Sequence, residues 1–192
     1  MAKGDKNDKE KTPEPPAKEK EVHIYSLATT VNECIIFLEE LEGSRLLPIW
    51  IGITEGQAIA IRFSGIVLPR PLTHDLLLAS YKALGWAVDK VVVTDLKENT
   101  FYATIFVSKD SEVREVDSRP SDAIAVAVRA GCKMFVSECV FDRCQVLAKP
   151  ISEDEVSHFR EELKSLKPED IFKDLQKKKK PKKDPEEEGD KG

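Results

Sequence analysis

Along most of the chain, hydrophobic residues occur either in short β-branched runs or at the three-to-four-residue spacing of a helix. These two patterns predict its strands and helices. Apolar runs rich in β-branched residues, separated by turn residues, predict strands over 22–29, 34–38, 46–51, 87–96, 100–108, 112–117 and 133–137. Runs with helical spacing predict helices over 55–64, 74–84, 120–130 and 153–166, with a further short helix from Pro168. Glu98-Asn99 and Lys109-Asp110 lie where tight turns would join the three consecutive strands between 87 and 117.

Local signals at the helix ends sharpen these expectations. Thr54 and Gln57 have the spacing of a capping box, and Thr73 is expected to cap the helix over 74–84. Pro120 suits a first helical turn, and Gly131 is expected to end that helix. Because the strands come in blocks instead of alternating strictly with helices, the sequence predicts an α+β fold, with a mixed β-sheet and helices packed against it.

Charge divides the chain into a folded centre and two polar ends. Residues 1–21 and 177–192 are lysine- and acid-rich without large apolar side chains beyond Met1, so they are expected to be disordered. We expect a domain over 22–150 and a helical extension over 151–176. The two ends hold 13 of the 30 basic and 11 of the 35 acidic residues, which leaves a net charge of −7 on the centre. Such a domain disfavours duplex nucleic acid unless a divalent cation or a local basic patch is present.

Other patterns bear on location and cofactors. The amino-terminus lacks an apolar stretch of signal-peptide length, and no run approaches the length of a membrane span, so we expect a cytoplasmic protein without membrane contact. The spacing of the four cysteines contains no Cys-x-x-Cys pair, which favours small buried hydrophobes over a zinc site. The sequence also contains neither a Gly-x-Ser-x-Gly elbow nor a glycine-rich phosphate loop.

The candidate chemistry lies in charged residues near the predicted helix starts: Glu55, His74, Asp75, Asp117, Arg119 and Asp122. Asp117 and Asp122 could together hold Mg²⁺, which prefers one or two carboxylates plus waters and substrate phosphate. A simpler interpretation remains open for several of them. Asp75 and Asp122 can be ordinary first-turn acids, and Arg119 can be an ion-pair partner of Asp122.

Four segments in order resemble a known family: Leu-Pro-Ile-Trp-Ile-Gly at 47–52, Glu-Gly-Gln-Ala at 55–58, Arg-Pro-Leu-Thr-His-Asp-Leu-Leu at 70–77 and Arg-Pro-Ser-Asp-Ala-Ile-Ala at 119–125. The chain is similar to the bifunctional nuclease domain family (BFN, DUF151) over roughly 22–146. The resemblance implies an α+β domain, usually a homodimer, and a magnesium-assisted nuclease (a hydrolase with RNase and DNase activity). It supplies no settled catalytic residues.

Two functional hypotheses follow. In the first, the protein is a metal-assisted phosphodiesterase that cleaves RNA or DNA. Its metal ligands are Asp117 and Asp122, Arg119 stabilises phosphate charge, His74 handles a proton, and Asp75 and Glu55 complete the catalytic set. In the second, the protein is a non-catalytic dimeric module that binds an anion or ligand through three arginines, Arg62, Arg70 and Arg119. The lysine run over 177–183 could separately tether nucleic acid, although a solvated tail is the simpler interpretation.

Overall fold

The computed structural model describes residues 18–29 and 33–148. The chain forms β1 (Glu19–Thr29), β2 (Cys34–Glu40), β3 (Arg45–Ile51), α1 (Ile53–Phe63), α2 (Thr73–Ala83), β4 (Ala87–Lys97), β5 (Thr100–Lys109), β6 (Glu112–Ser118), α3 (Pro120–Ala130), β7 (Lys133–Ser137), α4 (Glu138–Arg143) and β8 (Leu147–Ala148). The predicted helices beyond residue 150, the tail over 177–192 and most of the tail over 1–21 lie outside the described residues. The α+β class with a mixed sheet is confirmed.

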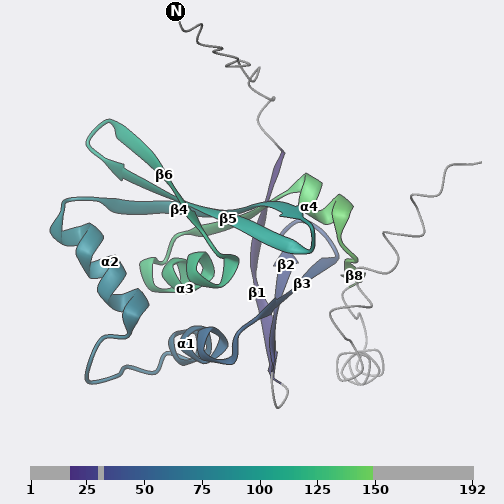
Figure 1. The fold of residues 1–192 in the computed structure, drawn as a ribbon, viewed down its shortest axis with the longest axis horizontal. Coiled ribbons are helices and arrows are strands. Elements are labelled where there is room, and N and C mark those ends of the chain that lie inside the picture. Colours follow the sequence, from purple (N-terminus) through teal and green to yellow (C-terminus); the bar gives the residue numbers. More distant parts are fainter. Residues whose placement is uncertain (1–17, 30–32, 149–192) are drawn as a thin grey trace, which may run out of the picture.

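All the strands belong to one sheet, in the order β6-β5-β4-β7-β1-β2-β3-β8. Its two halves are antiparallel meanders, β4 to β6 and β1 to β3. Strand β7 joins them, because it pairs parallel to β4 and antiparallel to β1. The strands of one half run across those of the other in Figure 1, as the twist of a large sheet requires.

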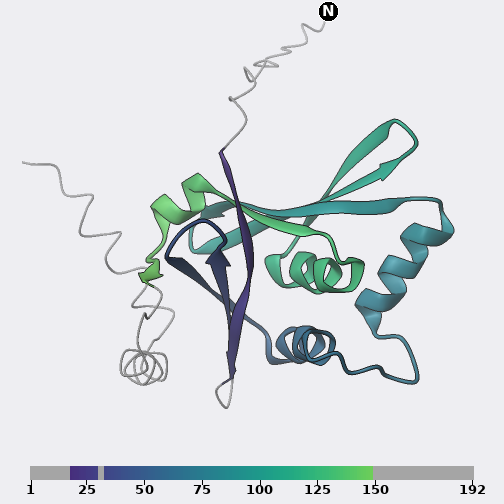
Figure 2. The same cartoon turned by 180° about the vertical axis from the view of Figure 1, so that it is seen from behind.

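Helices α2 and α3 cover one face of the β4–β6 half, while α1 packs on α3 and against β1 and β2. Helix α3 is the central helix of the three. Its apolar side, which includes Ala123, Val126 and Ala127, packs on Ala103, Ile105 and related residues of β4 and β5. Helices α1 and α2 flank α3, as Figures 1 and 2 show from opposite sides, while α4 lies at the other end of the sheet from α2. The small residues of α3 allow this close packing, and they bring the amino-terminal ends of α1, α2 and α3 toward one another.

Several predicted boundaries need correction. Helix α1 begins at Ile53 with Gly52 as its N-cap, so the Thr54 capping box is wrong. Helix α2 begins at Thr73 with Leu72 as its N-cap, and the Asp75 carboxylate accepts the Leu72 N–H at 2.9 Å. Both helices start one or two residues earlier than predicted, because the N-cap is the residue at which the backbone leaves the extended conformation, whatever its side chain. Strand β1 begins at Glu19, and α4 and β8 were not predicted.

Two other local predictions, the turn between β4 and β5 and the end of α3, are confirmed. Glu98 and Asn99 both have positive φ angles, 47° and 63°, in the turn between β4 and β5, as a tight hairpin requires. Helix α3 ends at Gly131 in the left-handed conformation, with φ of 71°. The four cysteines are free thiols. Within the described part of the chain, helices are too short or too polar to cross a membrane.

Candidate active site

Arg119 lies at the start of α3, where Pro120 occupies the first helical turn and leaves Arg119 in an extended N-cap conformation. Its guanidinium donates three hydrogen bonds to two carboxylates. Nε and Nη2 bind the two oxygens of Asp122 at 2.7 and 3.1 Å, and Nη1 binds Glu55 Oε1 at 3.0 Å. Arg119 therefore links the first turn of α3 to the first turn of α1.

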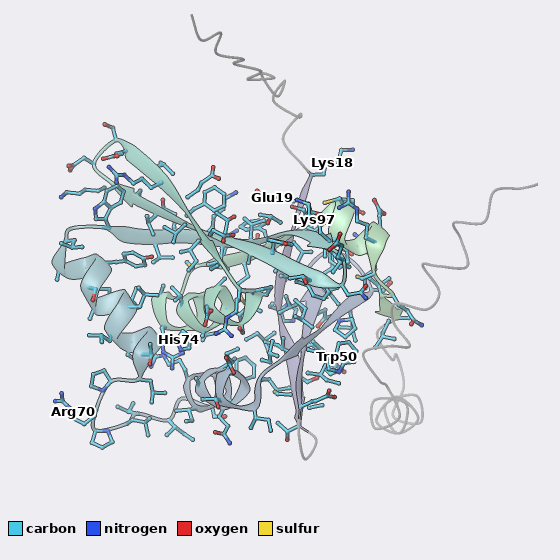
Figure 3. The ribbon with its side chains drawn as sticks, viewed as in Figure 1. Lys18, Glu19, Trp50, Arg70, His74 and Lys97 are labelled. Carbon is cyan, nitrogen blue, oxygen red and sulfur yellow. The ribbon has the colours of Figure 1, made fainter. Side chains whose placement is uncertain are left out.

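His74 extends this network to the first turn of α2. Its Nε2 lies 3.1 Å from Asp122 Oδ1, so the tautomer with hydrogen on Nε2 donates to this carboxylate. Its Nδ1 is buried without a hydrogen-bond partner among the described residues. Figure 3 shows His74 at the amino-terminal end of α2, on the side that faces α1 and α3. The result is a continuous polar chain from His74 through Asp122 and Arg119 to Glu55.

These four residues line one pocket with a volume of about 350 Å³. Its remaining walls come from α1 and the start of α2: Thr54, Gln57, Ala58, Ile61, Leu72 and Thr73. The amino-terminal end of a helix carries unpaired N–H groups and a partial positive charge. Three such ends surround the pocket, and their positive charge favours the Glu55 and Asp122 carboxylates that lie there. The Arg119 side chain is 65% exposed, so its guanidinium is accessible from solvent.

The contacts within the network favour the charged forms of Asp122 and Arg119. Burial by itself would raise the pKa of Asp122, but hydrogen bonds from Arg119 and His74 outweigh this effect and lower that pKa below its ordinary value. The hydrogen bond to Asp122, followed by that to Glu55, raises the pKa of Arg119 further above its already high ordinary value. The site therefore contains a permanent cation held between two carboxylates.

Gly52 makes room for Glu55. A Cβ atom at residue 52 would stand 2.2 Å from Glu55 Oε2, which means that the Glu55 carboxylate lies back over the helix start. This position places a negative charge at the positive end of the α1 dipole and directs Oε1 to Arg119. The glycine that ends the Leu-Pro-Ile-Trp-Ile-Gly segment thus supports the geometry of the site.

Asp75 belongs to a different network, which it forms with Arg129 of α3. Its Oδ1 accepts a hydrogen bond from Arg129 Nε at 2.8 Å. Arg129 also donates to the carbonyl oxygens of Ala125 and Ala58, at 2.9 and 3.1 Å. Asp75 therefore joins α2 to α1 and α3, and the structure does not bring it to the pocket with His74. Sequence reasoning missed Arg129, because nothing in the pattern of α3 distinguishes a buried arginine from an exposed one.

Asp117 lies apart from Asp122. It is an exposed residue of β6 paired with Thr104, whereas the neighbouring Ala103 and Ile105 face α3. Since side chains alternate along a strand, Asp117 points to the sheet face opposite α3. Both oxygens of Asp122 already accept hydrogen bonds. No group of three or more His, Cys, Asp and Glu side chains within 18–29 and 33–148 is placed to hold a metal ion. Asp117 and Asp122, as arranged, therefore do not fit the predicted magnesium site.

The fold and the pocket define an α+β domain with an arginine–carboxylate–histidine network at the meeting point of three helix starts. Comparison with known proteins gives this domain its family. The chain belongs to the bifunctional nuclease domain family, whose sequence pattern it matches over residues 36–149. All the residues of the polar chain described above fall within that span.

Individual relatives agree with this assignment. The chain is 39% identical over 149 residues to an uncharacterized protein of Mycobacterium tuberculosis (strain ATCC 25618 / H37Rv), which covers 73% of this chain and 89% of that protein. It is 30% identical over 115 residues to a protein named bifunctional nuclease 1 from Oryza sativa subsp. japonica. That match covers 58% of this chain but only 34% of the rice protein, and the Oryza minuta protein named bifunctional nuclease gives the same values.

Proposed function

We propose that the protein is a nuclease that hydrolyses phosphodiester bonds of RNA or DNA in the pocket formed by Glu55, His74, Arg119 and Asp122. One observation carries the proposal: residues from three distant segments converge in a single hydrogen-bonded chain around one pocket, with an accessible arginine at its mouth. Membership of the bifunctional nuclease domain family supports the same reaction.

In this proposal, Arg119 binds the non-bridging oxygens of the phosphate and stabilises the negative charge that develops there. A guanidinium presents five N–H donors in a planar fork, so Arg119 can exchange part of its carboxylate contacts for phosphate contacts without leaving the pocket. Its 65% exposure permits this movement. Such preorganised donors are the strongest contribution that this chain's own residues offer to the reaction.

Glu55 is our candidate for the general base. A water attacks phosphorus, one of its protons passes to the Glu55 carboxylate, the bond between phosphorus and the leaving oxygen breaks, and that oxygen takes a proton from solvent. His74 is assigned a positioning role, because its Nε2 binds Asp122 and its Nδ1 is buried. Asp122 in turn orients Arg119 through two hydrogen bonds. Whether Mg²⁺ assists the reaction stays a prediction, as does the homodimer.

The test is cleavage of labelled single-stranded RNA and DNA by the purified full chain, with and without EDTA. We expect Arg119→Ala to lower kcat by roughly 100- to 1000-fold, as loss of a donor to developing charge does elsewhere. Glu55→Gln should also lower kcat, while its pH–rate profile should lose the limb that belongs to the base. Arg114→Ala, an exposed arginine on β6, is the matched control.

Two results would reject the proposal. Wild-type cleavage by Arg119→Ala, purified in the same way, would place the reaction elsewhere or in a contaminant. Absence of cleavage by the wild-type protein under all metal conditions would favour the alternative, a non-catalytic module that binds anions.

A further inference from the structure

Arg62 and Arg70 differ from the other arginines that the structure describes. Five of the seven arginines within 18–29 and 33–148 form salt bridges with carboxylates. Arg62, in the last turn of α1, and Arg70, in the loop before α2, form none among those residues. Figure 3 shows Arg70 projecting from that loop. In an acidic domain, two exposed guanidinium groups without a carboxylate partner form a local positive patch.

Both arginines line a second pocket, with a volume of about 260 Å³, between the end of α1, the following loop and α2. The acid in its wall, Asp75, is already engaged by the Arg129 guanidinium and the Leu72 N–H. The positive charges of Arg62 and Arg70 therefore remain available, and the pocket suits an anion. A phosphate accepts hydrogen bonds from the planar guanidinium fork particularly well.

This second pocket is a direct neighbour of the candidate active site. Ile61 and Leu72 line both pockets, so the two cavities share a wall. An extended polymer with regularly spaced phosphates could occupy both at once. Next to the arginines, Val67 is 83% exposed and Leu68 is 39% exposed. These apolar side chains can contact bases, which a single strand exposes and a duplex conceals.

We propose that Arg62 and Arg70 bind a phosphate adjacent to the scissile one in a single-stranded nucleic acid. This subsite rests on the proposed function for the location of the scissile phosphate. It also answers the difficulty posed by the net charge of −7, because it supplies the local basic patch that a polyanion needs. The substrate class is therefore single-stranded RNA or DNA longer than one nucleotide.

The experiment measures binding separately from cleavage. Fluorescence anisotropy of a labelled single-stranded oligonucleotide is recorded in a Glu55→Gln background, over a range of salt concentrations, with and without Arg62→Gln plus Arg70→Gln. Because the two arginines share one phosphate, their removal should reduce the magnitude of the slope of log K against log salt by about 0.7. We expect about tenfold weaker binding at low salt, since such a loss corresponds to about 1.4 kcal/mol.

Matched controls and competitors separate the outcomes. Arg114→Gln makes the same charge change on an exposed arginine of β6, and it should bind within about twofold of its parent because only a long-range, salt-screened effect remains. Inorganic phosphate alone and a duplex of the same sequence serve as competitors, and both should compete less well than the single strand. Thermal unfolding of each variant confirms that it is folded.

Each result decides the proposal. A double variant that binds like the Arg114→Gln control overturns the subsite, even if the wild type cleaves nucleic acid. A selective loss in the double variant without any wild-type cleavage rejects the proposed nuclease but keeps the subsite as a binding site. A protein that binds no single-stranded oligonucleotide overturns both.

Discussion

Helix α3 carries two arginine networks, and they differ in burial and in the type of partner. Arg129, in the last turn of α3, has a side chain that is only 3% exposed. It binds Asp75, a backbone carbonyl of α3 and a backbone carbonyl of α1. Arg119 is 65% exposed before the first turn of α3, and it binds only carboxylates at the mouth of a pocket. Burial and two backbone carbonyls hold the Arg129 guanidinium in place, whereas the exposed Arg119 guanidinium can exchange partners. Burial and partner type, not the presence of an ion pair, separate a structural arginine from a functional one.

The largest expected effect is on the free energy of unfolding. Arg129→Met should destabilise the protein by about 3 kcal/mol, because it removes a buried guanidinium that pairs with the half-exposed Asp75 and donates to two backbone carbonyls. Arg119→Met should cost at most about 1 kcal/mol, the usual range for exposed pairs. Urea or guanidinium unfolding of both variants measures the difference. Equal losses would show that the comparison between the two networks is wrong.

The two glycines of the α1 start offer a smaller contrast. A Cβ at Gly56 would stand 2.3 Å from Cys34 Sγ and 2.7 Å from Cys34 Cβ, so Gly56→Ala must push α1 away from β2. We expect a loss of about 1–2 kcal/mol, after the better helix propensity of alanine is included. Gly52→Ala meets only the flexible end of Glu55 and should cost less than about 1 kcal/mol.

Activity should respond in the opposite order. By moving the Glu55 carboxylate away from Arg119, Gly52→Ala should lower kcat roughly 10- to 100-fold with little change in Tm. Gly56→Ala should lower Tm while keeping kcat close to the wild-type value at low temperature. A Gly52→Ala protein with unchanged kcat and KM would remove Glu55 from the reaction, since the substitution leaves every functional group present.

Sequence patterns predicted most of the elements because each has a strong local signal. The turn at Glu98-Asn99 and the end of α3 at Gly131 follow from residues that tolerate positive φ angles. The order of the sheet was beyond such reasoning. Strand β7 pairs between β4 and β1, and this choice depends on long-range packing of strands that look alike in sequence.

The site was predictable in part for a related reason. Glu55, His74, Arg119 and Asp122 were singled out because they sit near helix starts, and three of those starts meet in space. Proximity to a helix start also selected Asp75 and Asp117, because it does not predict where a side chain points. The Asp75 carboxylate binds Arg129 near the end of α3, and the Asp117 side chain lies on the sheet face opposite α3. The pocket residues differ from Asp75 and Asp117 in the direction of their side chains. Periodicity along a helix or strand predicts that direction only when the neighbouring elements are known.

The smallest expected effect concerns the pH dependence of stability. The pKa of Asp122 in the folded protein lies below its ordinary value of 3.8, so its ion pair stabilises the fold fully above that value. This contribution is lost as the pH falls through the lowered pKa. The difference in unfolding free energy between wild type and Asp122→Asn should therefore shrink on acidification below about pH 4, from a starting size below about 1 kcal/mol.

Denaturant unfolding of both proteins at a series of pH values measures this difference. Glu40, Glu138 and Asp95 also have lowered pKa values, so the stability of both proteins falls in acid, but their contributions cancel in the difference. A difference that stays constant from neutral to acidic pH would mean that Asp122 is not held by Arg119 and His74 in solution. The exposed Arg119 would then have no stable carboxylate partner in Asp122, and the comparison with Arg129 would no longer be one between two ion-paired arginines.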